Sequence, residues 1–492
     1  MLLVDVTIVQ VALPRIQQEL HASFTDLQWV IDAYALTLSA LILTSGTLAD
    51  RIGRKRVFIG GLALFTFASL LCGLSGSITL LILARGLQGF GGAAMFATSL
   101  ALIAQEFRGP ERAGAIAAWS ATVGGAVAIG PLIGGLLTEG LGWQWIFFVN
   151  IPIGVATIAI SATRMVNVRD PDAERLDWAG LITFSGGLFL LVFGLLRGNA
   201  SGWGSTLIAS ALAGAAILLV SFVVVEKRQP RPMFDLSLFE NRAFCGVSLA
   251  TFAVGAGMFA MFPYLTFYLQ NDLGYSPLQG GLRLLPATVL TFIVPLLTRS
   301  MAGRAPGAML GGGLGLTALG LLLMHGLTAG SQWTALLPGL LLAGVGIGLS
   351  NPAIASIALG VVRPERSGMA SGISNTFRIG GLAVGVAALG AVFQDRIARS
   401  LHASLGGAQH DLATAVASGG TRAATAFAHG RSDIVEAAMR AFVSGLNLIL
   451  LIGACLVFLG ALSAVSLVRL RDIHRRPAPG PSAMSEGETA QA

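Results

Sequence analysis

Long apolar runs restrict what this chain can fold into more than any other feature of its sequence. A bilayer core about 30 Å thick is crossed by about 20 residues of helix, and apolar runs of that length recur along the chain. Only 11% of the 492 residues carry charge, against about 25% in soluble domains. Strands of membrane barrels are shorter, about 10 residues with alternating polarity. The sequence therefore predicts an all-α, polytopic membrane protein.

Fourteen spans result when the chain is cut wherever an apolar run ends in charge or in Gly, Pro, Asn or Ser. A helix that ends before Pro14 is only about 20 Å long, so we expect an upstream segment to carry the cytoplasmic half of a truncated first span. The predicted spans cover approximately residues 1–13, 28–48, 57–75, 78–103, 113–137, 144–162, 178–196, 205–225, 244–269, 279–298, 307–325, 334–357, 367–393 and 443–467.

The order of the spans predicts two six-helix bundles, at residues 1–162 and 244–467, with two extra central helices between them. Residues 163–225 hold a cytoplasmic linker and the two inserted spans, and residues 226–243 form a second cytoplasmic linker. The polar outer segment 394–442 is typical of one or two amphipathic surface helices. The composition of the tail, within 468–492, predicts a disordered cytoplasmic end.

The basic residues predict the orientation. Of the 31 Lys and Arg residues, 21 lie in the tail and in the loops after even-numbered spans, and cytoplasmic loops retain such residues. We therefore expect a multi-pass protein of the cytoplasmic membrane with both termini in the cytoplasm. The net charge of +7 is spread over too few charges to indicate a nucleic-acid partner.

Four charged side chains remain inside predicted spans, where each costs about 2.5–3.5 kcal/mol. Asp5 and Arg85 lie at similar depths, about 13 and about 10 Å below the outer face, and are plausible partners. The pair can be static, or protonation of Asp5 can release Arg85. We favour the switch, because an apolar pair would hold the helices together at lower cost.

The other two intramembrane charges are Asp32 and Arg378. Asp32 lies about one turn into the second span, near enough to the outer surface to be hydrated. Two roles are equally favoured for it: an interfacial Asp, or a group that holds a cation or a proton. Arg378, with Asn375 one turn before it, has no acid at matching depth in the C-terminal half. Helix-end carbonyls or an anionic ligand group are its candidate partners, and a structural role is favoured.

Motifs in the first half resemble those of the major facilitator superfamily. The loop after the second span matches the superfamily pattern GxLaDrxGrkr, and an Asp beside clustered cations can form a cytoplasmic latch. The run from Arg85 through Gln88 to Gly89 is similar to the superfamily's RxxqG motif, whose Arg is associated with proton transfer. The loop motif comprises Gly46, Asp50, Arg51, Gly53, Arg54, Lys55 and Arg56.

The fifth span resembles the GPxxGG antiporter motif of exporters, with Gly130, Pro131, Gly134 and Gly135 in place and Ala126 where the family has another Gly. Proline bends a helix and small residues let helices approach closely. Residues 5–14 look like the LDxTIVNVALP signature of 14-span drug:proton antiporters of the EmrB/QacA type. Residues 143–154 are similar to the WRWIFxINxPIG entry of their sixth span.

The resemblance implies a proton-coupled antiporter that exports hydrophobic drug-like compounds, with Asp5, Arg85 and Asp32 in proton coupling. A dedicated exporter of a self-made antibiotic or siderophore, a proton-coupled importer and a non-transporting receptor or scaffold are the alternatives. We expect no enzyme activity, metal or cofactor beyond the proton gradient, because no nucleophile–base pair, metal-ligand set or nucleotide loop is present in the sequence. The partners would be a small-molecule substrate, protons and membrane lipid; whether a periplasmic adaptor takes part stays open.

Overall fold

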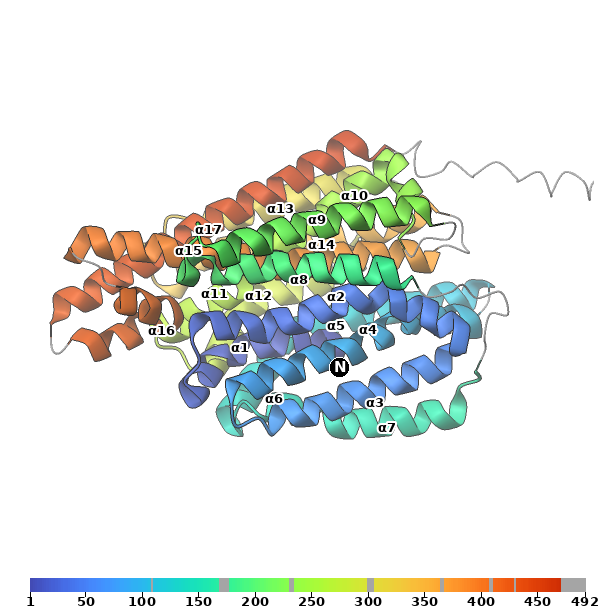
Figure 1. The fold of residues 1–492 in the computed structure, drawn as a ribbon, viewed down its shortest axis with the longest axis horizontal. Coiled ribbons are helices and arrows are strands. Elements are labelled where there is room, and N and C mark those ends of the chain that lie inside the picture. Colours follow the sequence, from blue (N-terminus) through green and yellow to red (C-terminus); the bar gives the residue numbers. More distant parts are fainter. Residues whose placement is uncertain are drawn as a thin grey trace, which may run out of the picture.

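Every element of the computed structural model is helical, and the helices run lengthwise through an elongated bundle (Figure 1). The structure describes residues 1–107, 109–167, 177–229, 234–298, 305–362, 367–406, 410–428 and 431–469. The N-terminal half comprises α1 (Leu2–Leu20), α2 (Phe24–Ile52), α3 (Arg54–Gly73), α4 (Ile78–Glu106), α5 (Gly109–Gly140), α6 (Trp145–Phe148) and α7 (Asn150–Arg164).

Two helices then form an inserted hairpin, α8 (Trp178–Ser201) and α9 (Thr206–Arg228), which lie side by side (Figure 1). The C-terminal half comprises η1 (Leu236–Glu240), α10 (Arg242–Ala253), η2 (Val254–Met258), η3 (Phe259–Met261), α11 (Phe262–Phe267), η4 (Tyr268–Asp272), α12 (Pro277–Leu297), α13 (Pro306–Met324), η5 (Trp333–Leu336), α14 (Leu337–Gly360), α15 (Ser367–Leu405), α16 (His410–Ala428) and α17 (Ser432–Leu467).

Within the described residues, 12 helical segments are long and apolar enough to cross a membrane. They match the predicted spans with the exception of the first and the fifth, which correspond to α1 and α5. In α1 the second half contains Arg15 and Glu19, which lower its hydropathy. The structure thus supports a helical membrane protein with about 12 spans.

Polar side chains fix where several helices begin. Ser23 accepts a hydrogen bond from the backbone N–H of Asp26, whose carboxylate accepts one from the Ser23 N–H in return. Ser276 and Gln279 repeat this capping box at the start of α12. Such caps satisfy N–H groups that the first helical turn leaves unpaired. Both caps lie at the end of the bundle where α16 (His410–Ala428) lies, which is called the α16 end below (Figure 1). The turns at this end are therefore set by local sequence.

The two halves meet along two pairs of helices, α5 with α12 and α2 with α15. At the first interface a Cβ on Gly135 would lie 2.6 Å from Leu278 Cα, and one on Gly281 would overlap the carbonyl oxygen of Pro131. Only glycine allows backbones to come this close. Helix α8 covers the second interface, because it packs against both α2 and α15.

The first helix does not end before Pro14, as the sequence predicted, but continues to Leu20. Proline removes one intrahelical hydrogen bond, and the helix can continue past it where neighbouring helices hold the chain. Ile16, two residues beyond Pro14, is fully buried and holds this part of the helix against its neighbours. The N-terminal end of α1 lies midway along the bundle (Figure 1).

The ninth predicted span, 244–269, is not one regular α-helix. It passes from α10 through the π-helix η2, the 3-10 turn η3 and α11 to the π-helix η4. Close backbone approaches accompany the change: a Cβ on Gly255 would overlap the carbonyl oxygen of Arg378, and one on Gly257 would lie 2.8 Å from the carbonyl oxygen of Gly453. Single-turn π segments inside helices are frequent at functional sites.

The outer segment 394–442, predicted as one or two surface helices, and the predicted linker 226–243 both contain helix. Residues 394–442 comprise the end of α15, the separate helix α16 and the start of α17, and α16 lies at one end of the bundle (Figure 1). Of the linker 226–243, residues 226–228 belong to α9 and residues 236–240 form η1. Hydrogen bonding continues α9 past residue 225, where the apolar pattern stops. The predicted tail lies outside the described residues from position 470 onward.

We predict that Gly281→Leu destabilises the α5–α12 interface, whereas Gly312→Leu does not. A side chain at position 281 meets the α5 backbone, and a Cβ at position 312 meets nothing within 4 Å. Overpacking of this kind costs about 1–3 kcal/mol. The measurement is the melting midpoint of each purified variant in detergent, and equal midpoints would contradict the close approach of α5 and α12.

Candidate functional site

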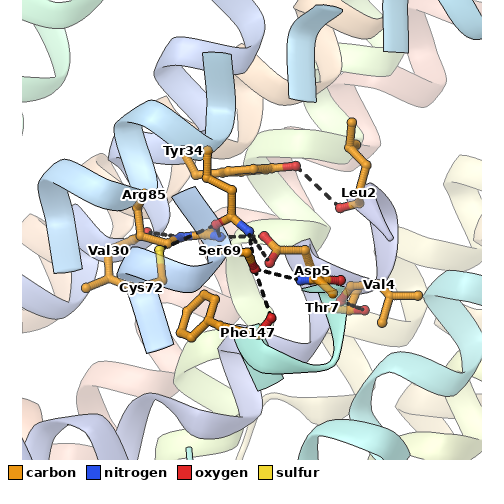
Figure 2. Close-up of polar contacts among 12 residues, drawn as sticks. Leu2, Val4, Asp5, Thr7, Val30, Tyr34, Ser69, Cys72, Arg85 and Phe147 are labelled. Carbon is orange, nitrogen blue, oxygen red and sulfur yellow. Dashed lines mark hydrogen bonds and ion pairs between the residues drawn. The ribbon is translucent and has the colours of Figure 1, made fainter. Parts of the chain in front are cut away.

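An ion pair between Asp5 and Arg85 lies at the centre of the N-terminal half. Arg85 Nη1 binds Asp5 Oδ2, joining α4 to α1 (Figure 2). Asp5 is 1% and Arg85 2% exposed, so neither charge reaches water. The structure therefore brings together the two charges that the sequence placed at similar depth.

Gln88 ties this ion pair to the neighbouring helices. Its Nε2 donates to Asp5 Oδ1 at 3.0 Å and to Ser69 Oγ at 3.2 Å, while its Oε1 accepts from Arg85 Nη1 at 2.7 Å. Ser69 in turn accepts from Asn150 Nδ2 at 3.1 Å and donates to the Phe147 carbonyl at 3.0 Å. The network thus joins α1, α3, α4, α6 and α7. No sequence pattern pointed to Ser69, a lone hydroxyl in an apolar helix.

Arg85 has further partners besides the carboxylate. Its Nε donates to the carbonyl oxygen of Val30 at 3.1 Å, and the guanidinium carbon lies 4.2 Å from the centre of the Tyr34 ring (Figure 2). The Tyr34 hydroxyl donates to the Leu2 carbonyl at 3.4 Å, which holds the ring in place. A cation above an aromatic face is stabilised by the ring quadrupole. The site can therefore stabilise the guanidinium even when Asp5 is neutral.

Asp32 is not at a hydrated surface, which corrects the simplest expectation for it. The side chain is fully buried, and within the described residues neither carboxylate oxygen has a hydrogen-bond partner. Helix α2 starts at Phe24, so Asp32 lies two turns inside it, on the same stripe as Gln28 and Ser39, which both contact α15. The carboxylate therefore faces the α2–α15 interface between the halves.

Side-chain hydrogen bonds from Gln28 and Gln270 join the two halves toward the α16 end, and one from Tyr264 lies within the C-terminal half. Gln28 Nε2 and the Tyr264 hydroxyl each donate to the carbonyl oxygen of Val386, both at 2.8 Å. Gln270 Nε2 donates to the carbonyl oxygen of Val11 at 2.9 Å. The sequence did not single out the two glutamines, because their partners are backbone carbonyls distant in sequence.

Arg378 and Asn375 contact each other on α15: Arg378 Nη2 donates to Asn375 Oδ1 at 2.5 Å. No described acid forms an ion pair with Arg378. The neighbouring Gly381 faces Phe252 of α10, whereas Thr376 faces Ser39 of α2. Arg378 lies near the Gly381 side of the helix, so the structure does not bring it together with Asp32.

The glycine-rich loop motif has separate parts in the structure. Gly53 has φ +109° at the junction of α2 and α3, where a side chain would be strained and would overlap Asn167. Gly46 lies inside α2 with nothing within 4 Å of an added Cβ, so it makes no close contact with another helix. The side chain of Asp50 lies outside what the structure describes, and Arg51 and Arg56 are exposed.

The remaining cations of this loop bind helix ends. Arg54 Nη1 donates to the carbonyl oxygen of Ala101 on α4 at 3.3 Å. Lys55 Nζ donates to the carbonyl oxygens of Ala162 and Met165, at 2.7 and 2.8 Å, where α7 ends. Cations are favourable at helix C-termini because those carbonyls are unpaired and carry partial negative charge. These contacts all lie within the N-terminal half.

The antiporter-like motif packs α5 against two helices at once. A Cβ on Gly134 would lie 2.9 Å from the Ile8 carbonyl oxygen, and one on Gly130 would overlap the Thr7 side chain, so both glycines face α1. Pro131 and Gly135 face α12 of the other half. The motif therefore lies where α1, next to Asp5, meets the interface between the halves.

Two helical halves around buried charges, with glycine-lined interfaces, define a multi-pass membrane transporter. The sequence model described as the Major Facilitator Superfamily matches residues 1–386. The chain belongs to this superfamily, a class of transporters that are in general not enzymes.

Similar proteins include several named for drug resistance or export. The chain is 36% identical over 408 residues to a multidrug resistance protein, Stp, of Mycobacterium tuberculosis, covering 82% of this chain and 76% of that protein. It is 35% identical to a tetracenomycin C resistance and export protein of Streptomyces glaucescens, over 81% and 74% of the two chains. A puromycin resistance protein of Streptomyces alboniger is 36% identical, over 80% and 79%.

Solved structures support the fold. A bacterial homologue of the human lysosomal transporter Spinster matches with a TM-score of 0.59 at 18% identity, covering 96% of this chain and 95% of that one. A human organic anion transporter matches with a TM-score of 0.56 at 15% identity, covering 93% and 96%. At these identities the similarity establishes the transporter architecture.

We predict that the stability losses from removing the two members of the buried ion pair are not additive. Asp5→Asn leaves the guanidinium without a counter-charge and Arg85→Gln leaves the carboxylate without one, each at a cost of about 3–5 kcal/mol. The double variant should lose clearly less stability than the two losses combined. Melting midpoints of the four purified proteins provide the measurement, and additive losses would contradict direct pairing.

Proposed function

We propose that this protein is a proton-coupled antiporter that exports hydrophobic drug-like compounds across the cytoplasmic membrane. The observation that carries the proposal is the Asp5–Arg85 ion pair, which is buried in an apolar bundle and belongs to a hydrogen-bond network spanning five helices. A buried ionisable pair inside a membrane is costly and is by default a functional candidate. The resistance and export proteins among its relatives support drug-like substrates.

In this mechanism Asp5 takes up a proton from the outer side and loses its attraction for Arg85. Arg85 then retains the Val30 carbonyl, the Gln88 amide oxygen and the Tyr34 ring, so its charge stays stabilised after the switch. The free-energy change of protonating Asp5 would differ between the inward-facing and the outward-facing state. That difference would couple proton binding to the conformational change. Gly130 and Gly134 connect the Asp5 segment of α1 to α5 and thereby to α12.

Asp32 is the second proton-coupling residue of the proposal. Burying a carboxylate without a counter-charge is unfavourable, so a proton or a cationic group must accompany it. The hydrogen bonds of Gln28 and Tyr264 with Val386 lie between Asp32 and the α16 end. Opening these contacts on the outer side would give Asp32 access to water. The Asp50 loop would hold the outward-facing form closed at the cytoplasmic face.

We further propose the 14-span architecture of the EmrB/QacA type, with both termini cytoplasmic. Helices α1 and α5 would add to the 12 segments that hydropathy identifies, α1 as part of the first span. The inserted hairpin α8–α9 is the pair that distinguishes this type from 12-span transporters. The α16 end would then face outward and the α2–α3 junction the cytoplasm.

A second candidate function is export of one self-made antibiotic. Relatives named as a tetracenomycin C export protein and a cephamycin export protein favour it, because their names each specify one compound. The same proton coupling would apply. A susceptibility panel that compares expressing with empty cells separates the two: protection against several unrelated compounds supports multidrug export, and protection against one scaffold supports a dedicated exporter.

We predict that inverted membrane vesicles containing the protein take up a fluorescent drug when a proton gradient is applied, and that Asp5→Asn abolishes this uptake. The uncharged side chain cannot exchange a proton, whereas exchange of labelled for unlabelled drug without a gradient should persist. The measurement is dye accumulation in energised vesicles, beside the exchange rate in the same preparation.

The control is Asp433→Asn, which removes an equally charged but exposed carboxylate that pairs with Arg431. It should leave the uptake rate within about twofold of the unaltered protein. Uptake by Asp5→Asn vesicles at the unaltered rate would refute the role of Asp5. Uptake only in right-side-out vesicles would indicate an importer, and no transport in either orientation would favour a receptor or scaffold.

We predict that single cysteines at Gly204 and Ser404 react with a membrane-impermeant maleimide in intact cells, whereas one at Arg228 reacts only after permeabilisation. The first two positions lie at the α16 side of the hairpin and of α15, and Arg228 lies at the opposite end of α9. Cys72, Cys245 and Cys455 are first replaced by Ser. Labelling of all three positions from outside would contradict the proposed orientation.

A further inference from the structure

Two carboxylates meet at the end of the inserted hairpin opposite to α16, away from the Asp5 network. Asp177 is the N-cap of α8, and its Oδ1 accepts from the Gly180 N–H at 2.8 Å and from Gln229 Nε2 at 3.2 Å. Glu226, in the last turn of α9, is 2% exposed, and its Oε2 accepts from the Phe234 N–H at 3.2 Å. One oxygen of each carboxylate is thus satisfied.

The other two oxygens face each other without any donor between them. Asp177 Oδ2 and Glu226 Oε1 are buried and have no hydrogen-bond partner within the part of the chain that the structure describes. They lie 2.6 and 2.7 Å from the same point, the position that a Cβ on Gly180 would take. Glycine at position 180 therefore leaves room for two acidic oxygens at close range.

Two bare carboxylates in this position would repel each other and would each lack a solvating group. Like charges that share a buried site do not both ionise, and one proton between them forms a hydrogen bond and removes one charge. A divalent cation fits less well, because Ca²⁺ and Mg²⁺ need six or more oxygen ligands and the two facing oxygens have no third acid beside them within the described chain. The arrangement favours a proton as the occupant.

We propose that Asp177 and Glu226 share one proton and form a proton-binding site that holds the hairpin closed at this end. Among the residues described in 177–229 and 234–298, the other charges nearby do not neutralise the pair: Asp235, which caps η1, is acidic, and Lys227 and Arg228 on α9 are exposed. The site is independent of the Asp5–Arg85 network and of any transport activity.

The shared proton affects more than the hairpin, because the backbone N–H of Phe234 donates a hydrogen bond to Glu226. The Phe234 ring stacks on Phe239 at 5.6 Å and lies 6.3 Å from the Phe377 ring of α15. Helix α8 itself packs across α2 and α15, one from each half. Loss of the proton adds a second negative charge, pushes the ends of α8 and α9 apart and weakens the attachment of the hairpin to the C-terminal half.

The sign of the pH dependence follows from proton linkage. The closed hairpin binds one more proton than the open one, so the closed form is favoured at low pH and is lost as pH rises through the range in which the pair ionises. In that range the opening constant should rise about tenfold per pH unit, as expected for release of one proton.

Hydrogen–deuterium exchange of the full-length protein in lipid nanodiscs tests the predicted pH dependence of hairpin opening. The exchange rate is measured on peptides that cover the first turn of α8 and the last turn of α9. In a series from about pH 5 to about pH 9, after correction for the intrinsic rate, the opening constant of the unaltered protein should rise about tenfold per pH unit until the closed pair loses its shared proton, and should level off above that pH. Glu226→Gln should abolish the slope, because an amide N–H donates to Asp177 at every pH. Asp177→Asn should do the same while it still caps α8.

The matched control is Glu436→Gln, which changes an exposed carboxylate paired with Arg440 and should keep the slope. A slope that is absent from the unaltered protein, or that persists in both Glu226→Gln and Asp177→Asn, would overturn the proposal. Restored protection at high pH on addition of Ca²⁺ or Mg²⁺ would overturn it in favour of a cation site.

Discussion

The attraction between the Asp5 carboxylate and the Arg85 guanidinium determines how the N-terminal half is built. Neither charge can face lipid, and each must have polar partners once it leaves water. Gln88, Ser69 and Asn150 supply those partners from three helices, and the Tyr34 ring covers the guanidinium from α2. The positions of five helices around Asp5 follow from the requirement that every member of the network is satisfied, since a partly satisfied buried network would be destabilising.

The glycine motif of α5 transmits the position of this network to the other half. Gly130 and Gly134 face Thr7 and Ile8, which follow Asp5 by two and three residues in α1. Gly135 faces Leu278 of α12. Backbones in contact move together, because no flexible side chain lies between them to absorb a shift. The motif that resembles an exporter signature is therefore best understood as a rigid connection between the charged site and the interface, rather than as a group that binds protons itself.

The sequence predicted the parts of this structure that depend on local or periodic signals. The helical class, most span positions and the pairing of Asp5 with Arg85 follow from hydropathy and depth. Pro14 was misleading, because packing of Ile16 outweighs the lost hydrogen bond. Ser69, Gln28 and Gln270 could not be found, because a single polar residue in an apolar helix has no periodicity and its partners are distant in sequence. The burial of Asp32 likewise depends on α15, some 350 residues away along the chain.

Asp5 and Asp32 are both buried carboxylates, but their surroundings differ. The difference bears on the order in which they act in the proposed cycle. The counter-charge of Asp5 lies on α4 of the same half, so separation of the halves does not by itself remove it. Asp32 has no counter-charge in the described chain and lies against α15 of the other half, so its environment changes whenever the halves separate. Opening the Gln28–Val386 contact alters the solvation of Asp32 directly and that of Asp5 only through α1 and α5. In the proposed cycle Asp32 would therefore respond first to opening toward the α16 end, and Asp5 would couple that event to the rest of the N-terminal half.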